Sequence, residues 1–207
     1  MAIAKVNDLV ARGKAKLVPA AVQEALDAAC APEDILNAMI SAMDVVGEKF
    51  KNGEIFVPEM LIAAKAMKKG VEVLKPHLAT GAAGALGKVV IGTVAGDLHD
   101  IGKNLVAMMI ESAGFEVIDL GVDVPVEKFV EAAKGEGVKI MACSALLTTT
   151  MPALEATVAA LNAMENRASF KVMVGGAPIT QEFADKVGAD AYTADAASAA
   201  KKAKELA

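Results

Sequence analysis

One short stretch of the sequence combines residues that can hold a metal ion or a proton. It reads Gly96-Asp97-Leu98-His99-Asp100-Ile101-Gly102-Lys103. Asp97 lies two residues before His99, so its carboxylate can accept a hydrogen bond from one imidazole nitrogen and leave the other nitrogen with a free lone pair. A histidine oriented in this way suits a metal ligand or a general base. The stretch alone is also compatible with an ordinary strand-to-helix loop that carries a surface histidine.

The flanking residues place this histidine at the end of a strand. Residues 88–94 form a short β-branched run, which is typical of a strand buried on both faces. From Ile101 to Ala113 the apolar residues recur at helical spacing. His99 is therefore expected in the loop at the carboxyl end of a strand, where open α/β sheets bind their ligands.

Composition excludes several classes of protein. The chain has 207 residues, a formal net charge of −5 and no basic cluster, which argues against a nucleic-acid surface. No apolar stretch reaches membrane-spanning length and the amino terminus lacks a signal-peptide pattern, so we expect a cytoplasmic protein with no membrane partner. Cys30 and Cys143 lack the spacing of metal ligands and are expected to be reduced, buried thiols.

The first part of the chain shows only helical periodicity. It predicts a four-helix bundle in residues 1–78, with helices at about 3–11, 18–29, 32–50 and 58–78. Pro32 and Pro58 fit the first turns of their helices. Residues 79–87 are small and contain glycine, which favours a flexible linker before a second domain at 88–207.

In the second domain, strands and helices alternate, which predicts an α/β fold with a doubly wound parallel sheet. Strands are expected at about 88–94, 116–119, 140–144, 171–175 and 191–193. Helices are expected at about 101–113, 126–134, 151–166, 180–187 and 196–206.

Three later loops leave the same carboxyl edge of this sheet. The third strand ends in a hydroxyl-rich run from Ser144 to Thr150, which N-capping and turn chemistry would partly explain. The fourth strand ends in Gly175-Gly176, which marks a tight turn or clears space for a bulky ligand. The fifth strand contains Tyr192, the only tyrosine, near its end. These loops are therefore expected to share one site with His99.

Taken together, these stretches resemble the corrinoid proteins of multi-component methyltransferase systems, which are similar to the cap and cobalamin modules of cobalamin-dependent methionine synthase. The resemblance rests on the stretch from Gly96 to Asn104, on Ser144-Ala145-Leu146 and on Gly175-Gly176, and it covers nearly the whole chain. It implies a flavodoxin-like five-stranded parallel sheet with helices on both faces, preceded by a helical cap. It also implies cobalamin bound base-off, with His99 as the lower ligand of cobalt and Asp97 hydrogen-bonded to His99.

The same resemblance implies roles for other residues. Thr150 extends the pair of His99 and Asp97, although methionine synthase has serine at this position. Phe56 and Met60 of the cap shield the upper face of the cofactor. Further contacts with the cofactor are implied for the turn, the later loops and the last helix, at Gly96, Leu98, Asp100, Ile101, Gly102, Ser144, Leu146, Thr148, Gly175, Gly176, Tyr192 and Ala196.

The implied function is methyl transfer. Cob(I)alamin would accept a methyl group from a substrate-specific methyltransferase. Methylcob(III)alamin would deliver it to a second methyltransferase acting on tetrahydrofolate or coenzyme M, and a reductive activase is a further expected partner. The chain is expected to be a carrier component rather than a complete enzyme. Two alternatives stay open, the cobalamin-binding subunit of an adenosylcobalamin mutase and a cobalamin-dependent sensor module. The sequence does not specify the methyl donor.

Overall fold

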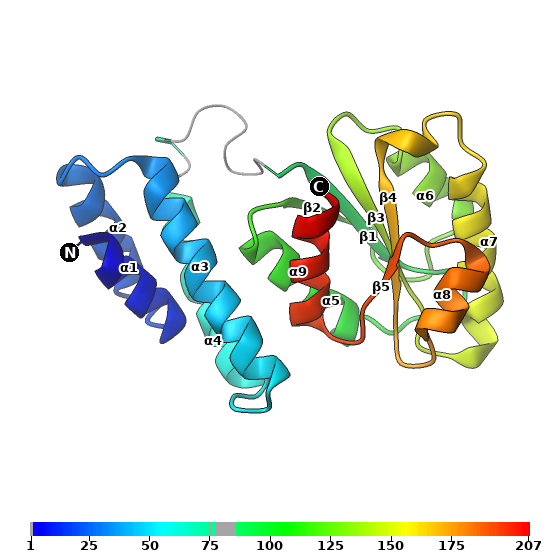
Figure 1. Cartoon of the computed structure of the whole chain (residues 1–207), viewed down its shortest axis with the longest axis horizontal. Coiled ribbons are helices and arrows are strands. Elements are labelled where there is room, and N and C mark those ends of the chain that lie inside the picture. Colours follow the sequence, from blue (N-terminus) through cyan, green and yellow to red (C-terminus); the bar gives the residue numbers. More distant parts are fainter. Residues whose placement is uncertain (1, 75, 78–85) are drawn as a thin grey trace. The chain divides into compact units, whose positions relative to one another are not determined.

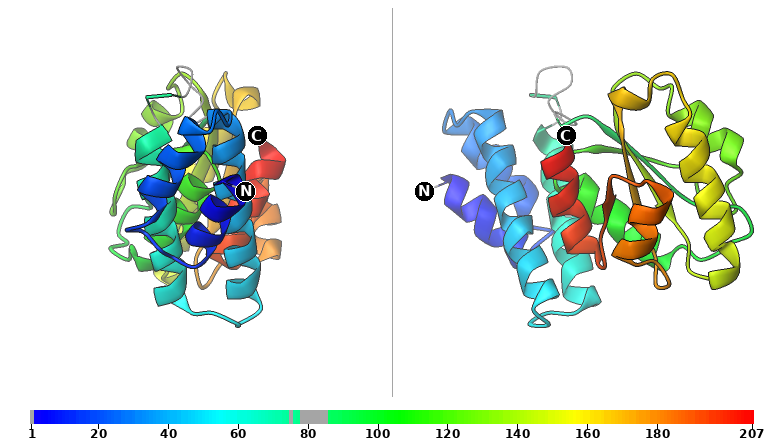
Figure 2. Two further views of the ribbon diagram at one scale, coloured as in Figure 1. Left: turned by 90° about the vertical axis from the view of Figure 1, so that its left-hand side faces the viewer. Right: turned by 45° about the vertical axis from the view of Figure 1, so that its right-hand side comes forward.

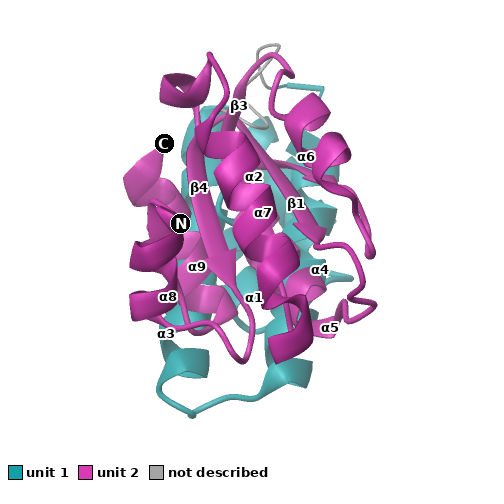
Figure 3. Ribbon diagram, turned by 90° about the vertical axis from the view of Figure 1, so that its right-hand side faces the viewer, with its two compact units in different colours: residues 1–85, 112–114 teal, residues 86–111, 115–207 magenta. Residues whose placement is uncertain are grey.

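The computed structural model describes residues 2–74, 76–77 and 86–207 (Figure 1). The chain divides into two compact units, one formed by residues 1–85 with 112–114 and the other by residues 86–111 with 115–207 (Figure 3). Residues 79–85 of the expected linker lie outside the described residues.

The first unit is helical. Residues 2–74 form four helices, α1 (Ala2–Ala11), α2 (Val18–Asp27), α3 (Pro32–Lys51) and α4 (Val57–Leu74), which pack as a bundle (Figure 2). The apolar stripe of each helix is buried, with Met39 and Met67 fully or almost fully enclosed. Pro32 is the first residue of α3, and Pro58 lies in the first turn of α4. The predicted bundle is confirmed.

One helix is shorter than its periodicity predicted. The pattern extends to residue 78, but α4 ends at Leu74. Pro76 follows two residues later, and proline cannot donate the backbone hydrogen bond that would continue a helix. The end at Leu74 is therefore a correction to the predicted boundary, and residue 78 lies outside the described residues.

The second unit is a five-stranded parallel sheet in the order β2-β1-β3-β4-β5, which confirms the predicted flavodoxin-like fold. Its strands are β1 (Lys88–Thr93), β2 (Glu116–Asp119), β3 (Val138–Ser144), β4 (Lys171–Gly175) and β5 (Ala191–Tyr192). Its helices are α5 (Ile101–Ser112), α6 (Val126–Ala132), α7 (Met151–Asn162), α8 (Gln181–Val187) and α9 (Ala196–Leu206).

Helices cover both faces of this sheet. Figure 1 shows α5 and α9 on one face and α6, α7 and α8 on the other. Under α6, α7 and α8 lies an apolar cluster built around Phe129, Leu154 and Phe170. The other buried members are mostly aliphatic, as the aromatic content of 3% predicts. This packing fixes the strands, and with them the loops that leave their carboxyl ends.

The helix after β3 is also shorter than predicted. The expected helix runs to residue 166, whereas α7 ends at Asn162. The Asn162 side chain donates a hydrogen bond to the carbonyl of Gly188 and accepts one from Arg167. These contacts turn the chain toward β4, so tertiary bonding outweighs local helix propensity here.

No helix within residues 2–74, 76–77 and 86–207 has both the length and the apolar character required to cross a membrane.

Candidate functional site

The site is built on the loop between β1 and α5. Gly96 adopts a positive φ of 81°, a conformation that glycine reaches without strain, and the chain turns there. Asp97 is fully buried, whereas the His99 side chain is 50% exposed. α5 begins at Ile101, and its first turn is anchored by Lys103, a buried lysine whose Nζ lies 2.6 Å from Oδ1 of Asp119 at the end of β2. The loop thus presents the imidazole at the surface and keeps the carboxylate inside.

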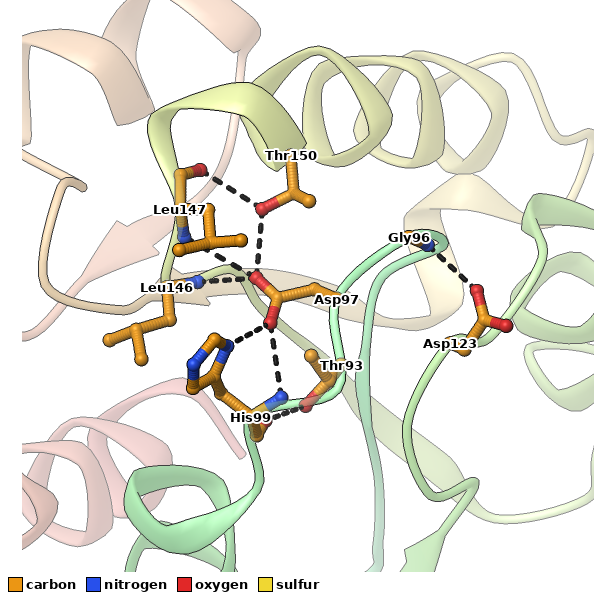
Figure 4. A network of polar contacts seen from close by, with 8 residues as sticks. All are labelled: Thr93, Gly96, Asp97, His99, Asp123, Leu146, Leu147 and Thr150. Atoms are coloured by element: carbon orange, nitrogen blue, oxygen red, sulfur yellow. Dashed lines mark hydrogen bonds and ion pairs between the residues drawn. The ribbon is translucent and has the colours of Figure 1, made fainter.

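The Asp97 carboxylate accepts hydrogen bonds from two segments, its own turn and the loop after β3 (Figure 4). Oδ1 lies 2.8 Å from Nδ1 of His99 and 3.1 Å from the His99 amide nitrogen. Oδ2 accepts from the Leu146 amide at 2.7 Å, from the Thr150 hydroxyl at 2.8 Å and from the Leu147 amide at 3.4 Å. Asp97 and Thr150 therefore lie in direct contact with each other, and Asp97 bridges Thr150 and His99.

These bonds decide the charge of the carboxyl group. Burial by itself raises the pKa of Asp97, but the donated hydrogen bonds, led by that of the Leu146 amide, outweigh burial and hold the pKa well below its usual range. An ionised carboxylate can only accept hydrogen bonds, so Nδ1 of His99 must carry the proton. Nε2 of the neutral ring then keeps its lone pair and faces away from Asp97 (Figure 4).

The backbone of the turn is held from a loop that the sequence interpretation passed over. Oδ1 of Asp123 accepts a hydrogen bond from the Gly96 amide at 2.7 Å, and the Asp123 amide donates to the carbonyl oxygen of Asp97 at 2.9 Å. On the other side, the buried Thr93 hydroxyl donates to the carbonyl of His99 at 2.9 Å. Asp123 follows the second strand at the same carboxyl edge, and that position is the signal that could have identified it.

Strand register brings the remaining loops to this edge. Thr93 pairs with Ser144, and Ser144 pairs with Gly175, so β1, β3 and β4 end side by side. Ser144 is partly buried at the end of β3, while Thr148 is exposed at the start of a 3₁₀ turn that leads into α7. Tyr192, partly buried, ends β5, and Ala196 begins α9 and is buried. All the sites predicted in the second unit thus lie at strand ends or in the segments that follow them.

Gly176 has a structural reason to be glycine. Its φ is 129°, and a Cβ atom there would lie 1.8 Å from the carbonyl oxygen of Ala145. The loop after β4 therefore packs directly on the loop after β3. Gly175 is different. A Cβ atom added there would lie 3.6 Å from the carbonyl oxygen of Thr193, which is an ordinary contact distance.

Comparison with known proteins identifies the family. A protein-family model described as "B12 binding domain" matches residues 87–202, and a second family model of the same description matches residues 2–75. The chain belongs to the B12-binding corrinoid proteins.

Proteins of similar sequence are named corrinoid proteins. Dimethylamine corrinoid protein 2 of Methanosarcina mazei is 45% identical over 205 residues, which cover 99% of this chain and 96% of the relative.

Solved structures agree in fold. A cobalamin-binding protein from Desulfitobacterium hafniense matches with a TM-score of 0.84 and 32% identity, over 99% of this chain and 98% of that one. The methanol:cobalamin methyltransferase complex MtaBC of Methanosarcina barkeri contains a chain that matches with a TM-score of 0.85 and 32% identity, over 99% of this chain and 79% of that one.

The surroundings of His99 in this corrinoid protein fit a large, partly apolar ligand. Leu98 is 72% exposed and Ile101 is 79% exposed, on either side of the imidazole in sequence. Exposed apolar side chains gathered at one place mark a binding surface. Gly102 lies within α5, where an added Cβ would meet no atom within 4 Å, so nothing in the protein itself requires glycine there. Close approach of a ligand would explain it.

The two predicted shield residues differ in exposure. Phe56 immediately precedes α4 and is 69% exposed, and its amide donates a hydrogen bond to Oε2 of Glu59 at 3.1 Å. Met60, one turn into α4, is buried. Of the two, Phe56 has the ring surface free for contact with a ligand.

Replacing Asp97 by asparagine should destabilise the cofactor-free protein by about 1–3 kcal/mol at pH 7. Each oxygen of Asp97 accepts a backbone N–H, so either orientation of the asparagine amide would place its NH₂ group against a donor. Because the pKa of Asp97 is lowered in the folded protein, the carboxylate stabilises the fold at pH values above the pKa of the unfolded chain, about 3.9. This contribution is lost as the pH falls from there through the lower pKa of the folded state. Urea denaturation of both proteins at pH 7 and in acid should therefore show the difference shrinking at low pH.

Asp195→Asn is the matched control. Asp195 also accepts a backbone N–H and a hydroxyl, both from Ser198, but it caps α9, where asparagine performs as well as aspartate. A loss in Asp195→Asn equal to that in Asp97→Asn would contradict a special role of the Asp97 acceptor pair.

Proposed function

We propose that this corrinoid protein binds cobalamin at the carboxyl edge of its sheet, with His99 as the lower ligand of cobalt, and carries a methyl group between two methyltransferases. The observation that carries the proposal is the buried, ionised Asp97 that fixes Nδ1–H of His99 and leaves Nε2 with a lone pair. Neither a mutase subunit nor a sensor module is favoured by the relatives described above.

The bound corrinoid would supply a cobalt centre able to take up and release a methyl group. The protein's own residues govern the proton on His99. When Nε2 is not coordinated, it is a basic nitrogen open to solvent, while the anionic Asp97 keeps its hydrogen bond with Nδ1–H. Thr150 donates to the other oxygen of Asp97 and so keeps that carboxylate oriented toward His99. The three side chains can thus couple ligation of His99 to proton uptake at Nε2.

The remaining predicted residues are proposed to bind the rest of the cofactor. Residues 88–207 would form the cobalamin-binding domain, in which Ser144, Gly175 and Tyr192 accommodate the displaced nucleotide tail. Residues 1–78 would form the cap, with Phe56 as the main shield. Because Cys30 and Cys143 are free thiols, and burial raises the pKa of Cys143 to about 12, the protein suits a reducing cytoplasm.

Methylamines are the proposed class of methyl donor. The M. mazei relative at 45% identity is named for dimethylamine, whereas the chain in the methanol complex is 32% identical. The first partner would then be a methylamine-specific methyltransferase, and the second would act on coenzyme M or tetrahydrofolate, with a reductive activase in support.

Methyl uptake from a defined donor tests this function. The protein, reconstituted with reduced cobalamin, is incubated with ¹³C-dimethylamine and a dimethylamine methyltransferase, or with ¹³C-methanol and a methanol methyltransferase. We expect the label to stay with the protein in the first mixture and to reach coenzyme M or tetrahydrofolate once the second methyltransferase is added. Uptake from methanol alone would contradict the donor class, and uptake from neither would contradict the carrier function.

His99→Ala should remove the axial nitrogen from cobalt. Pulsed electron paramagnetic resonance of the Co(II) form should show a histidine nitrogen in the native protein and lose it in the variant. His77→Ala is the control, because His77 is the only other histidine in the chain. A nitrogen signal from the cofactor's own base in the native protein would refute base-off binding.

Phe56→Ala should shorten the lifetime of the reduced cofactor in air without unfolding the protein. The ring is mostly exposed, so its removal should change stability by less than about 0.5 kcal/mol. Oxidation is followed by absorbance. Val45→Ala serves as control, since Val45 is an exposed apolar residue on α3. Equal oxidation rates in the native protein and Phe56→Ala, or equal acceleration in both variants, would contradict shielding by Phe56.

A further inference from the structure

The loop between β2 and α6 continues beside β1 after β2 itself has ended. The Thr93 amide donates to the carbonyl of Gly121, and the Val124 amide donates to the carbonyl of Thr93, each at 3.0 Å. Val94 and Val124 then form an isolated parallel bridge. The loop is therefore fixed along the last residues before the turn that carries His99.

Asp123 in this loop makes two hydrogen bonds with the backbone of the turn. Its carboxylate accepts from the Gly96 amide and its own amide donates to the Asp97 carbonyl, so one residue holds both ends of the Gly96–Asp97 segment. Asp123 also has a φ of 51°, one of two positive values among the non-glycine residues described. Such a conformation persists only where the surrounding contacts impose it.

From these two hydrogen bonds we infer that Asp123 is a positioning residue, which sets the place of the His99 ring by fixing the backbone of Gly96 and Asp97. The carboxylate of Asp97 is held from the loop after β3, through Leu146 and Thr150. The backbone of the same residue is held from the loop after β2, through Asp123. The direction of Nε2 therefore depends on both loops, although the inference toward cobalt rests on the proposed ligation by His99.

Two substitutions separate position from charge. Asp123→Gly accepts the positive φ and keeps the amide that bonds to the Asp97 carbonyl, but loses the acceptor for the Gly96 amide. Asp123→Asn also loses the negative charge, yet its amide oxygen can take the same hydrogen bond, and asparagine tolerates this backbone conformation. Asn166→Ala is a remote control that loses one side-chain bond, to the carbonyl of Ala133.

The first measurement uses the cofactor-free protein. In Asp123→Gly, hydrogen exchange of the Gly96 amide should be faster by about threefold to tenfold, the range expected for one lost hydrogen bond. Nitrogen NMR of the His99 ring should show a smaller fraction of the Nδ1–H tautomer. Asp123→Asn and Asn166→Ala should resemble the native protein in both respects.

The second measurement uses the loaded protein. In its Co(II) form, the ratio of His99-bound to His99-free cobalt should fall by about threefold to tenfold in Asp123→Gly and stay near the native value in Asp123→Asn. Native behaviour of Asp123→Gly, or equal losses in Asp123→Gly and either Asp123→Asn or Asn166→Ala, would overturn the inference. If even the native protein shows no histidine nitrogen, the proposed ligation fails, and the exchange and tautomer data still decide whether Asp123 positions the ring.

Discussion

The buried charge of Asp97 is the constraint on which the site depends. An ionised carboxylate removed from water is costly unless hydrogen-bond donors replace its hydration shell. Here the donors come from its own turn and from the loop after β3, including the amide of Leu146 and the hydroxyl of Thr150. The fold must bring these two segments together for the charge to be tolerated. With the two segments together, Nδ1 of His99 lies against the carboxylate and the other ring nitrogen faces away from Asp97 (Figure 4).

Parallel strand register is what makes this meeting possible. Thr93 lies opposite Ser144, so the loops after β1 and β3 start at the same height on the sheet. The order β2-β1-β3 also places the loop after β2 on the other side of β1, where Asp123 reaches Gly96. A shift of either neighbouring strand would move these donors and acceptors several ångströms along the sheet. The apolar cluster around Phe129 and Leu154 therefore supports the chemistry indirectly, by fixing the register.

The parts of this arrangement that are local in sequence could be predicted, and the parts that join distant segments mostly could not. The hydrogen bond between Asp97 and His99 follows from a spacing of two residues, and the sheet follows from alternating strand and helix patterns. The residue type does not reveal the role of the Leu146 amide, because every residue except proline has the same backbone N–H. The position of Asp123 after the second strand places it at the carboxyl edge, but its hydrogen bonds with Gly96 and Asp97 depend on how the loop after β2 packs beside the turn. The early end of α7 likewise depends in part on the hydrogen bond from the Asn162 side chain to Gly188, which lies beyond β4 in the sequence.

The buried Asp97 and the half-exposed His99 have different tasks: Asp97 holds the ring in place, and His99 presents it at the surface. The His99 side chain is half exposed while Asp97 beneath it is fully buried, so the imidazole can meet a large ligand without any change in the buried bonds. If the histidine must bind and release cobalt in each cycle, the protein gains from a support that keeps the same geometry in both states. The carboxylate can then hold Nδ1–H in either case, and only Nε2 changes its partner. Flexibility in Gly96 and Asp97 would let the ring turn away from this direction, whereas hydrogen bonds to the loops after β2 and β3 hold the turn in place.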